Sequence, residues 1–136
     1  MEQMEQVEIL LVEDNPLDAE LTIRALKKGG LANKLLWLKD GAQALDYLFR
    51  RGNYADRDDV FPRLVLLDLK MPRVDGMAFY RAIAATTPAL AARLIFVTGD
   101  VVGTDAERFL EDSGCRWLAK PFRLGDLLRA ARDVLA

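Results

Sequence analysis

The chain alternates short apolar runs with longer stretches in which apolar residues recur at helical spacing. Apolar runs of this length suit the buried strands of a parallel sheet, and they are too short for most helices. The runs predict five strands, which are Val7–Val12, Lys34–Leu38, Arg63–Leu67, Leu94–Val97 and Arg116–Ala119.

The longer stretches predict helices between and after these strands. Asp40 is suited to begin a helix, whereas Gly29-Gly30 and Gly52 are suited to end one. A long polar loop is expected over Gly52–Pro62. The strict alternation of strand and helix indicates a single α/β domain, 1–136, with helices on a parallel sheet. The five expected helices are Leu17–Lys28, Asp40 to about Arg51, Gly76–Thr86, Gly103–Asp112 and about Leu124–Leu135.

Composition narrows the class of protein further. The net charge of −2 provides no basic field for nucleic acid or an anionic membrane, and no apolar run is long enough to span a bilayer. The lone Cys115 and the acidic, polar segment Met1–Glu8 fit a cytoplasmic protein without a signal peptide. The chain has no histidine, so histidine bases, metal ligands and phosphocarriers are excluded.

Polar side chains follow several of the expected strands. Glu13 and Asp14 follow the first strand, Asp68 the third, Thr98 the fourth and Lys120 the fifth. In an open parallel sheet the ligand crevice lies at these carboxyl ends. Carboxylates that converge there cannot all stay ionised without a cation, and oxygen ligands favour Mg²⁺. Taken separately, Glu13–Asp14 fits a turn with a helix cap and Lys120 fits a surface lysine, but their combination favours a metal site.

Four segments carry a family resemblance: Leu11–Asn15, Leu67–Pro72 with Asp75-Gly76, Val97–Gly99 and Lys120–Phe122. They resemble the receiver domains of response regulators, and the resemblance extends over essentially the whole chain. It implies a flavodoxin-like fold with the strand order 2-1-3-4-5. It also implies that the chain accepts a phosphoryl group in a two-component phosphorelay.

The same resemblance assigns roles to individual residues. Asp68 is the implied phosphoacceptor, and Mg²⁺ is held by Glu13, Asp14, Asp68 and the backbone carbonyl of Lys70. A carboxylate that attacks phosphorus needs its repulsion from the phosphoryl oxygens cancelled, which a divalent cation and an ammonium group do together. Lys120 is the implied ammonium group, and the Thr98 hydroxyl can donate a hydrogen bond to a phosphoryl oxygen.

Further positions are implied to control the switch and access to it. Trp117 stands where the family usually has a tyrosine or phenylalanine that swings inward on activation, although an aromatic that merely covers the sheet edge fits equally well. Lys70 and Asp100, each two residues beyond a site residue, flank the mouth of the site in receivers. They are expected to pair across it, while Gly99 leaves space beside the phosphoryl group.

The resemblance divides along the chain. Glu13–Leu21 and Asp40–Leu48 look like the small response regulators that serve phytochromes, whereas Phe96–Asp100 and Lys120–Phe122 look more like receivers of hybrid histidine kinases. Ordinary divergence, natural recombination and a deliberate chimera all fit this pattern.

The favoured function is a phosphoacceptor switch, not a turnover enzyme, that signals through protein contacts. Its expected partner is a histidine kinase, with a phytochrome kinase as one candidate, or a phosphotransfer protein; a homodimer also fits, and no nucleic-acid or membrane partner is expected. Two alternatives are a receiver cut from a hybrid histidine kinase and a Mg²⁺-dependent phosphatase with an aspartate nucleophile. The phosphatase class wants a second acid two residues after the nucleophile, where this chain has Lys70.

Overall fold

The computed structural model describes residues 8–31, 34–56, 61–68, 76–99, 105–120 and 122–135. Within them lies a five-stranded sheet in which every neighbouring pair of strands is parallel. The strand order is β2-β1-β3-β4-β5, so the predicted doubly wound topology is confirmed. The strands are β1 (Ile9–Val12), β2 (Leu35–Leu38), β3 (Leu64–Leu67), β4 (Leu94–Thr98) and β5 (Arg116–Ala119).

The five predicted helices are present in the described residues. The sequence did not predict the short helix α4 (Pro88–Ala91), which begins at a proline, or the 3₁₀ turn η1 (Gly52–Tyr54) inside the expected loop. The longer helices are α1 (Pro16–Lys28), α2 (Gly41–Leu48), α3 (Gly76–Thr86), α5 (Asp105–Ser113) and α6 (Leu124–Leu135).

Helix α2 ends at Leu48, earlier than the predicted end near Arg51. The chain turns here because Arg50 adopts a left-handed backbone conformation with a φ of 54°. The N–H of Arg51 then donates to the carbonyl of Asp46 at 2.8 Å, which closes the helix end. The predicted first residue of the fourth long helix, Gly103, lies outside the described residues, and α5 is described from Asp105.

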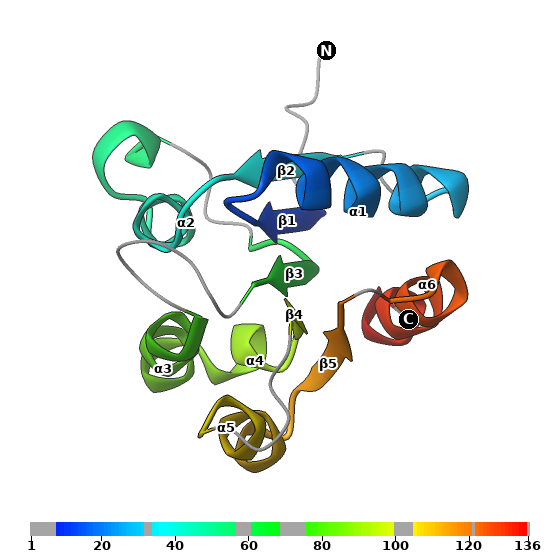
Figure 1. Ribbon diagram of the computed structural model, residues 1–136. Helices are drawn as coiled ribbons and strands as arrows, with labels where there is room; N and C mark the ends of the chain where they lie inside the picture. Colours follow the sequence, from blue (N-terminus) through cyan, green and yellow to red (C-terminus); the bar gives the residue numbers. More distant parts are fainter. Residues whose placement is uncertain are drawn as a thin grey trace.

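Helices cover both faces of the sheet (Figure 1), with α1 and α6 on one side and α2 to α5 on the other. Successive strand residues point to opposite faces, so each strand supplies two cores. In β1, Ile9 and Leu11 pack with α1 and α6, whereas Leu10 and Val12 pack with the helices of the other face. Burial on both faces explains why the central strands are continuously apolar.

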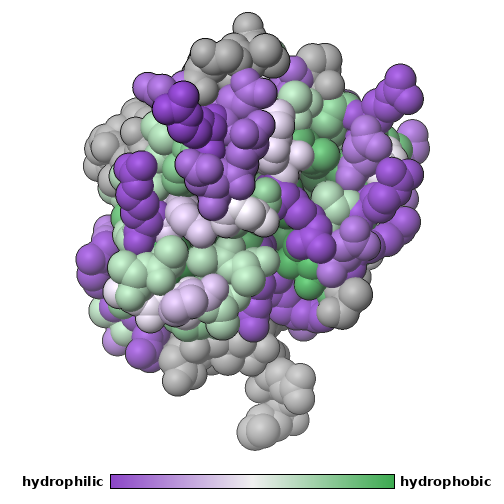
Figure 2. Space-filling model, turned by 90° about the horizontal axis from the view of Figure 1, so that it is seen from below, coloured by the Kyte–Doolittle hydropathy of each residue, from purple (hydrophilic) through white to green (hydrophobic). Residues whose placement is uncertain are grey.

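The face of the molecule that is seen from below is mixed rather than uniformly apolar (Figure 2). Seen from below, where α5 lies nearest the viewer, hydrophilic and hydrophobic surface are interspersed (Figure 2). Helix α5 buries Leu110 while its acidic Glu111 and Asp112 are exposed, as an amphipathic surface helix should. Among the described helices, none combines the length and the apolar character needed to cross a bilayer.

The parallel arrangement brings the carboxyl ends of the strands to one edge of the sheet. Backbone hydrogen bonds fix the residues just beyond those ends. The N–H of Glu13 donates to Leu38 at 3.1 Å, that of Asp68 to Val12 at 3.1 Å, and that of Lys120 to Thr98 at 2.6 Å. The residues that follow β1, β3 and β5 are therefore held by the sheet itself.

Candidate functional site

Three carboxylates meet at this edge of the sheet. Glu13, Asp14 and Asp68 each offer an oxygen, and these oxygens lie within 4.8 Å of one another. Glu13 and Asp68 are buried, whereas Asp14 is exposed. Carboxylate oxygens at such spacing suit a hard divalent cation, and the open side at Asp14 leaves room for the water ligands that Mg²⁺ usually keeps. The residues present therefore fit a magnesium site.

Glu13 is held by contacts from three segments. Its Oε1 accepts from the Lys120 Nζ at 2.7 Å, its Oε2 from the Asn15 N–H at 3.2 Å, and its carbonyl from the Trp37 indole at 2.8 Å. The pKa of this carboxyl is raised to about 7, chiefly by burial and with a smaller contribution from the charge of Asp68, while the hydrogen bond from Lys120 partly opposes the rise. Glu13 is thus poised to lose its proton when a cation arrives.

Lys120 places one ammonium group among three carboxylates. Its Nζ lies 2.7 Å from Glu13, 2.9 Å from Asp18 and 3.2 Å from Asp68. Burial lowers the pKa of Lys120, but the hydrogen bonds to Glu13 and Asp18 and the charge of Asp68 outweigh that effect. The pKa therefore lies above the ordinary lysine value, and the group stays charged beside Asp68.

Asp18 was not among the site residues predicted from the sequence. It lies in the first turn of α1, which is capped by Asn15: the Asn15 Oδ1 accepts from the N–H groups of Leu17 at 2.9 Å and Asp18 at 3.1 Å. Because Asn15 serves as the cap, Glu13 and Asp14 are free for other contacts. A signal for Asp18 was present in the sequence. It is an acidic residue in the first turn of the helix that directly follows Glu13 and Asp14.

Thr98 ends β4 as a fully buried residue. Among the buried side-chain atoms that the structure describes, its Oγ1 has no hydrogen-bond partner. Buried hydroxyl groups are normally satisfied, so an orphaned one at a ligand edge calls for an explanation. A phosphoryl oxygen on the neighbouring strand end would supply the missing partner.

The remaining predicted site residues are Trp117, Gly99, Lys70 and Asp100. Trp117 is half-buried, pairs with Phe96 across β4 and β5, and packs against the core beneath α2 to α5. A Cβ atom added at Gly99 would meet no atom within 4 Å in the part of the chain that the structure describes. Lys70 and Asp100 lie outside the described residues. The predicted Lys70 carbonyl ligand and the predicted Lys70–Asp100 pair therefore stay predictions.

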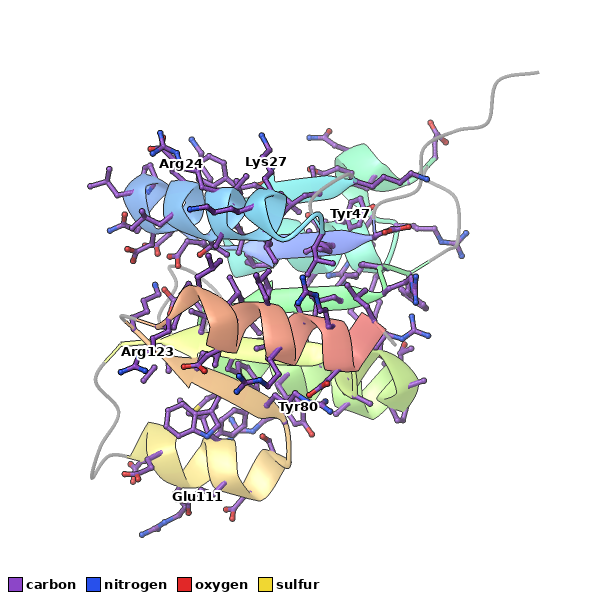
Figure 3. All side chains as sticks on the ribbon, turned by 90° about the vertical axis from the view of Figure 1, so that its right-hand side faces the viewer. Arg24, Lys27, Tyr47, Tyr80, Glu111 and Arg123 are labelled. Atoms are coloured by element: carbon purple, nitrogen blue, oxygen red, sulfur yellow. The ribbon has the colours of Figure 1, made fainter. Side chains whose placement is uncertain are left out.

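An apolar surface borders the site on the side of α1 and α6. These helices lie side by side (Figure 3), and a hollow of about 490 Å³ lies beside α1, next to Lys120. Leu17 and Leu21 are exceptionally exposed for leucines, at 70% and 62%. The hollow is lined by Asp18, Leu21, Thr22, Ala25, Lys120, Phe122 and Leu124.

The fold and the acidic edge agree with comparisons to known proteins. The response regulator receiver domain family matches residues 9–132, and the chain belongs to this family. Its family function is to accept a phosphoryl group in two-component signalling. Members of the family are typically phosphoacceptors with weak autophosphatase activity.

Individual relatives support the assignment of the chain to this family. The probable methanogenesis regulatory protein FilR2 of Methanothrix harundinacea is 36% identical over 126 residues, which cover 93% of this chain and 79% of that protein. The structure of the bacteriophytochrome response regulator AtBRR matches with a TM-score of 0.80 and 36% identity, over 96% of this chain and 94% of that chain.

A receiver from a sensor kinase matches as well. The receiver domain of sensor histidine kinase PA1611 from Pseudomonas aeruginosa is 28% identical, with a TM-score of 0.73 over 96% of this chain and 98% of that chain. That structure has a magnesium ion coordinated in its active-site cleft. The relatives thus include both phytochrome response regulators and receivers of histidine kinases, as the resemblance predicted.

Proposed function

We propose that Asp68 is the phosphoacceptor of this receiver and that Glu13, Asp14 and Asp68 hold Mg²⁺ beside it. The observation that carries the proposal is the position of Asp68, which is buried among carboxylates with the Lys120 ammonium 3.2 Å away. The backbone carbonyl of Lys70 is the further proposed ligand. Mg²⁺, when bound, supplies positive charge to the oxygens of Asp68 and of the incoming phosphoryl group.

The proposed reaction transfers a phosphoryl group from a phosphohistidine. An oxygen of Asp68 attacks the phosphorus, and the new P–O bond forms as the P–N bond breaks, with the electron pair returning to the donor imidazole. Lys120 offsets the negative charge on the phosphoryl oxygens, and Thr98 donates its orphaned hydroxyl to one of them. Water later cleaves the aspartyl phosphate, which releases inorganic phosphate and restores the carboxylate.

The proposed phosphodonor is a histidine kinase, with a phytochrome kinase as the first candidate because of the similarity to AtBRR, or a phosphotransfer protein. Its docking surface is the apolar strip formed by Leu17, Leu21 and Leu124. This strip borders the hollow that contains Lys120, so a donor seated on it would stand beside Asp68. Leu21→Glu should slow transfer from the kinase and leave labelling by a small phosphodonor unchanged.

The decisive experiment locates the phosphoryl group. The protein is treated with acetyl phosphate and Mg²⁺, and the modified residue is mapped by mass spectrometry. Asp68→Asn should abolish the label while the protein remains folded, because the change is nearly isosteric. Asp112→Asn, an exposed acid on α5, is the matched control and should label normally. Label on another residue, or label that persists in Asp68→Asn, rejects the assignment.

We further propose that the chain acts as a stoichiometric switch in one domain, not as a phosphatase. Lys70 occupies the position where an aspartate-nucleophile phosphatase needs its second acid. Phosphate release from acetyl phosphate should therefore be limited by slow hydrolysis of the aspartyl phosphate. Rapid, sustained release at many turnovers per minute would favour the phosphatase instead.

A further inference from the structure

Trp37 connects the second strand to the acidic edge of the sheet. It lies in β2 opposite Leu11 of β1, and its indole N–H donates to the backbone carbonyl of Glu13 at 2.8 Å. Glu13 directly follows β1 and precedes Asp14, so the hydrogen bond reaches the peptide that joins two of the clustered carboxylates.

This contact completes the fixation of the Glu13 backbone. The N–H of Glu13 donates to the carbonyl of Leu38, also in β2, at 3.1 Å. Both backbone polar groups of Glu13 are therefore held by one strand. Because a peptide unit is planar, fixing the Glu13 carbonyl also fixes the direction of the following N–Cα bond of Asp14. The orientation of the exposed acid thus depends on an indole one strand away.

The ring of Trp37 has a separate role in packing. It is half-buried against the core under α1 and α6, and the Lys39 Nζ lies 5.4 Å from the centre of the ring. These contacts use the faces and edges of the ring and do not require its N–H. The packing role and the hydrogen-bonding role can therefore be separated by replacing the N–H alone.

We propose that Trp37 is a positioning residue of the metal site: its indole N–H orients the Glu13–Asp14 peptide and thereby strengthens binding of Mg²⁺. The proposal rests on the proposed function in one respect, which is that these carboxylates hold a divalent cation. In this role Trp37 acts only through the backbone of Glu13, to which its indole N–H donates.

The sharpest test removes one hydrogen-bond donor. Trp37 is replaced site-specifically by 3-benzothienylalanine, which keeps the ring shape and puts sulfur in place of the N–H, and separately by phenylalanine. The dissociation constant for Mg²⁺ is measured by calorimetry on the full chain. Loss of one neutral hydrogen bond should weaken Mg²⁺ binding by about 2- to 10-fold in both variants. The melting temperature without metal should fall by only a few degrees in the benzothienyl variant, because the hydrogen bond is lost and the packing of the ring is kept.

Leu35→Ala is the matched control in the same strand. Leu35 packs against the same core and lies opposite Ile9, four residues before Glu13, so this change should lower the melting temperature and leave the Mg²⁺ dissociation constant unaltered. An independent readout is exchange of the Trp37 indole proton with solvent, measured by NMR without metal. The proton should be protected.

The outcomes separate the two proposals. Equal Mg²⁺ affinity in the unmodified and benzothienyl proteins, or fast exchange of the indole proton, would overturn the positioning role while the metal site stands. An unmodified protein that does not bind Mg²⁺ would overturn the metal site, and with it the role of Trp37. An effect in the phenylalanine variant alone would assign Trp37 to packing and also reject the proposal.

Discussion

The ammonium of Lys120 lies 2.9 Å from the carboxylate of Asp18, although the two residues are 102 positions apart in the sequence. This ion pair ties the first turn of α1 to the end of β5. Asp18 is more exposed than Glu13 and Asp68, the other two partners of Lys120. Asp18, the most exposed of the three carboxylates, thus competes with Asp68 for the Lys120 ammonium, which the proposed phosphoryl transfer needs.

The first prediction concerns Asp18→Asn. The variant should be labelled by acetyl phosphate up to about fivefold faster, because the mouth of the site loses one negative charge and Lys120 is shared by fewer carboxylates. The rate is measured in the presence of saturating Mg²⁺. Glu20→Gln, which breaks the exposed pair of Glu20 with Arg24 on the same helix, is the control and should leave the rate unchanged. Slower labelling of Asp18→Asn would mean that Asp18 helps to position Lys120 for catalysis.

The second prediction concerns pH and metal. The pKa of Glu13 is raised to about 7 in the folded protein, from 4.5 for an ordinary glutamate. Between these values the folded chain keeps a proton that the unfolded chain has lost, so this group makes the metal-free protein less stable as pH rises from about 4.5 to 7. Mg²⁺ needs the ionised form, and its affinity should increase over the same interval and then level off.

Melting temperatures at several pH values, with and without Mg²⁺, check this behaviour. Mg²⁺ at 100 times its dissociation constant should add about 2.7 kcal/mol to the stability of the folded state. Glu13→Gln should remove the pH dependence that this carboxyl contributes and weaken the stabilisation by metal. A melting temperature indifferent to Mg²⁺ at pH 8 would count against the whole acidic site.

The site could be predicted in outline because strand ends are readable from the sequence. Continuous apolar runs define β1, β3 and β4, and parallel pairing then brings Glu13, Asp68 and Thr98 to one edge. The predicted strand order came from the family resemblance, and the observed order confirms it.

What the sequence missed are contacts that depend on three-dimensional angles. The Asp18–Lys120 pair requires the first turn of α1 to lie beside the end of β5, and the Trp37–Glu13 bond requires the register that places Trp37 opposite Leu11. No local pattern encodes either. The end of α2 was predicted too late because Arg50, a residue that rarely adopts a positive φ, occupies the position where helices usually place glycine.

The third prediction concerns the left-handed backbone conformation of Arg50. Arg50 has a φ of 54°, and its side chain is exposed. Arg50→Gly should therefore stabilise the protein by about 0.5–1 kcal/mol, since glycine adopts this conformation without the clash of a Cβ atom. The neighbouring Arg51 has a φ of −115°, so Arg51→Gly gains nothing there and should be neutral or destabilising. Urea unfolding of both variants measures the difference, and equal effects would contradict the strain at Arg50.

The last prediction separates two buried threonines that differ in one respect. Thr22 donates its hydroxyl to the Asp18 carbonyl at 2.9 Å, whereas the described structure gives the Thr98 hydroxyl no partner. Both residues are buried. Thr22→Val loses a satisfied hydrogen bond and should lower stability by about 1 kcal/mol, while Thr98→Val replaces an unsatisfied group with a methyl and should leave stability equal or higher.

In the rate of phosphorylation, unlike in stability, Thr98→Val should have the larger effect of the two substitutions. A hydrogen bond to a charged phosphoryl oxygen contributes about 1.5–3 kcal/mol, so Thr98→Val should slow labelling of Asp68 by acetyl phosphate roughly 10- to 100-fold. Thr22→Val should label near the normal rate, because the Thr22 hydroxyl is already engaged with the Asp18 carbonyl. A Thr98→Val protein that melts early and labels normally would show that this hydroxyl has a structural partner in the resting protein and no part in phosphoryl transfer.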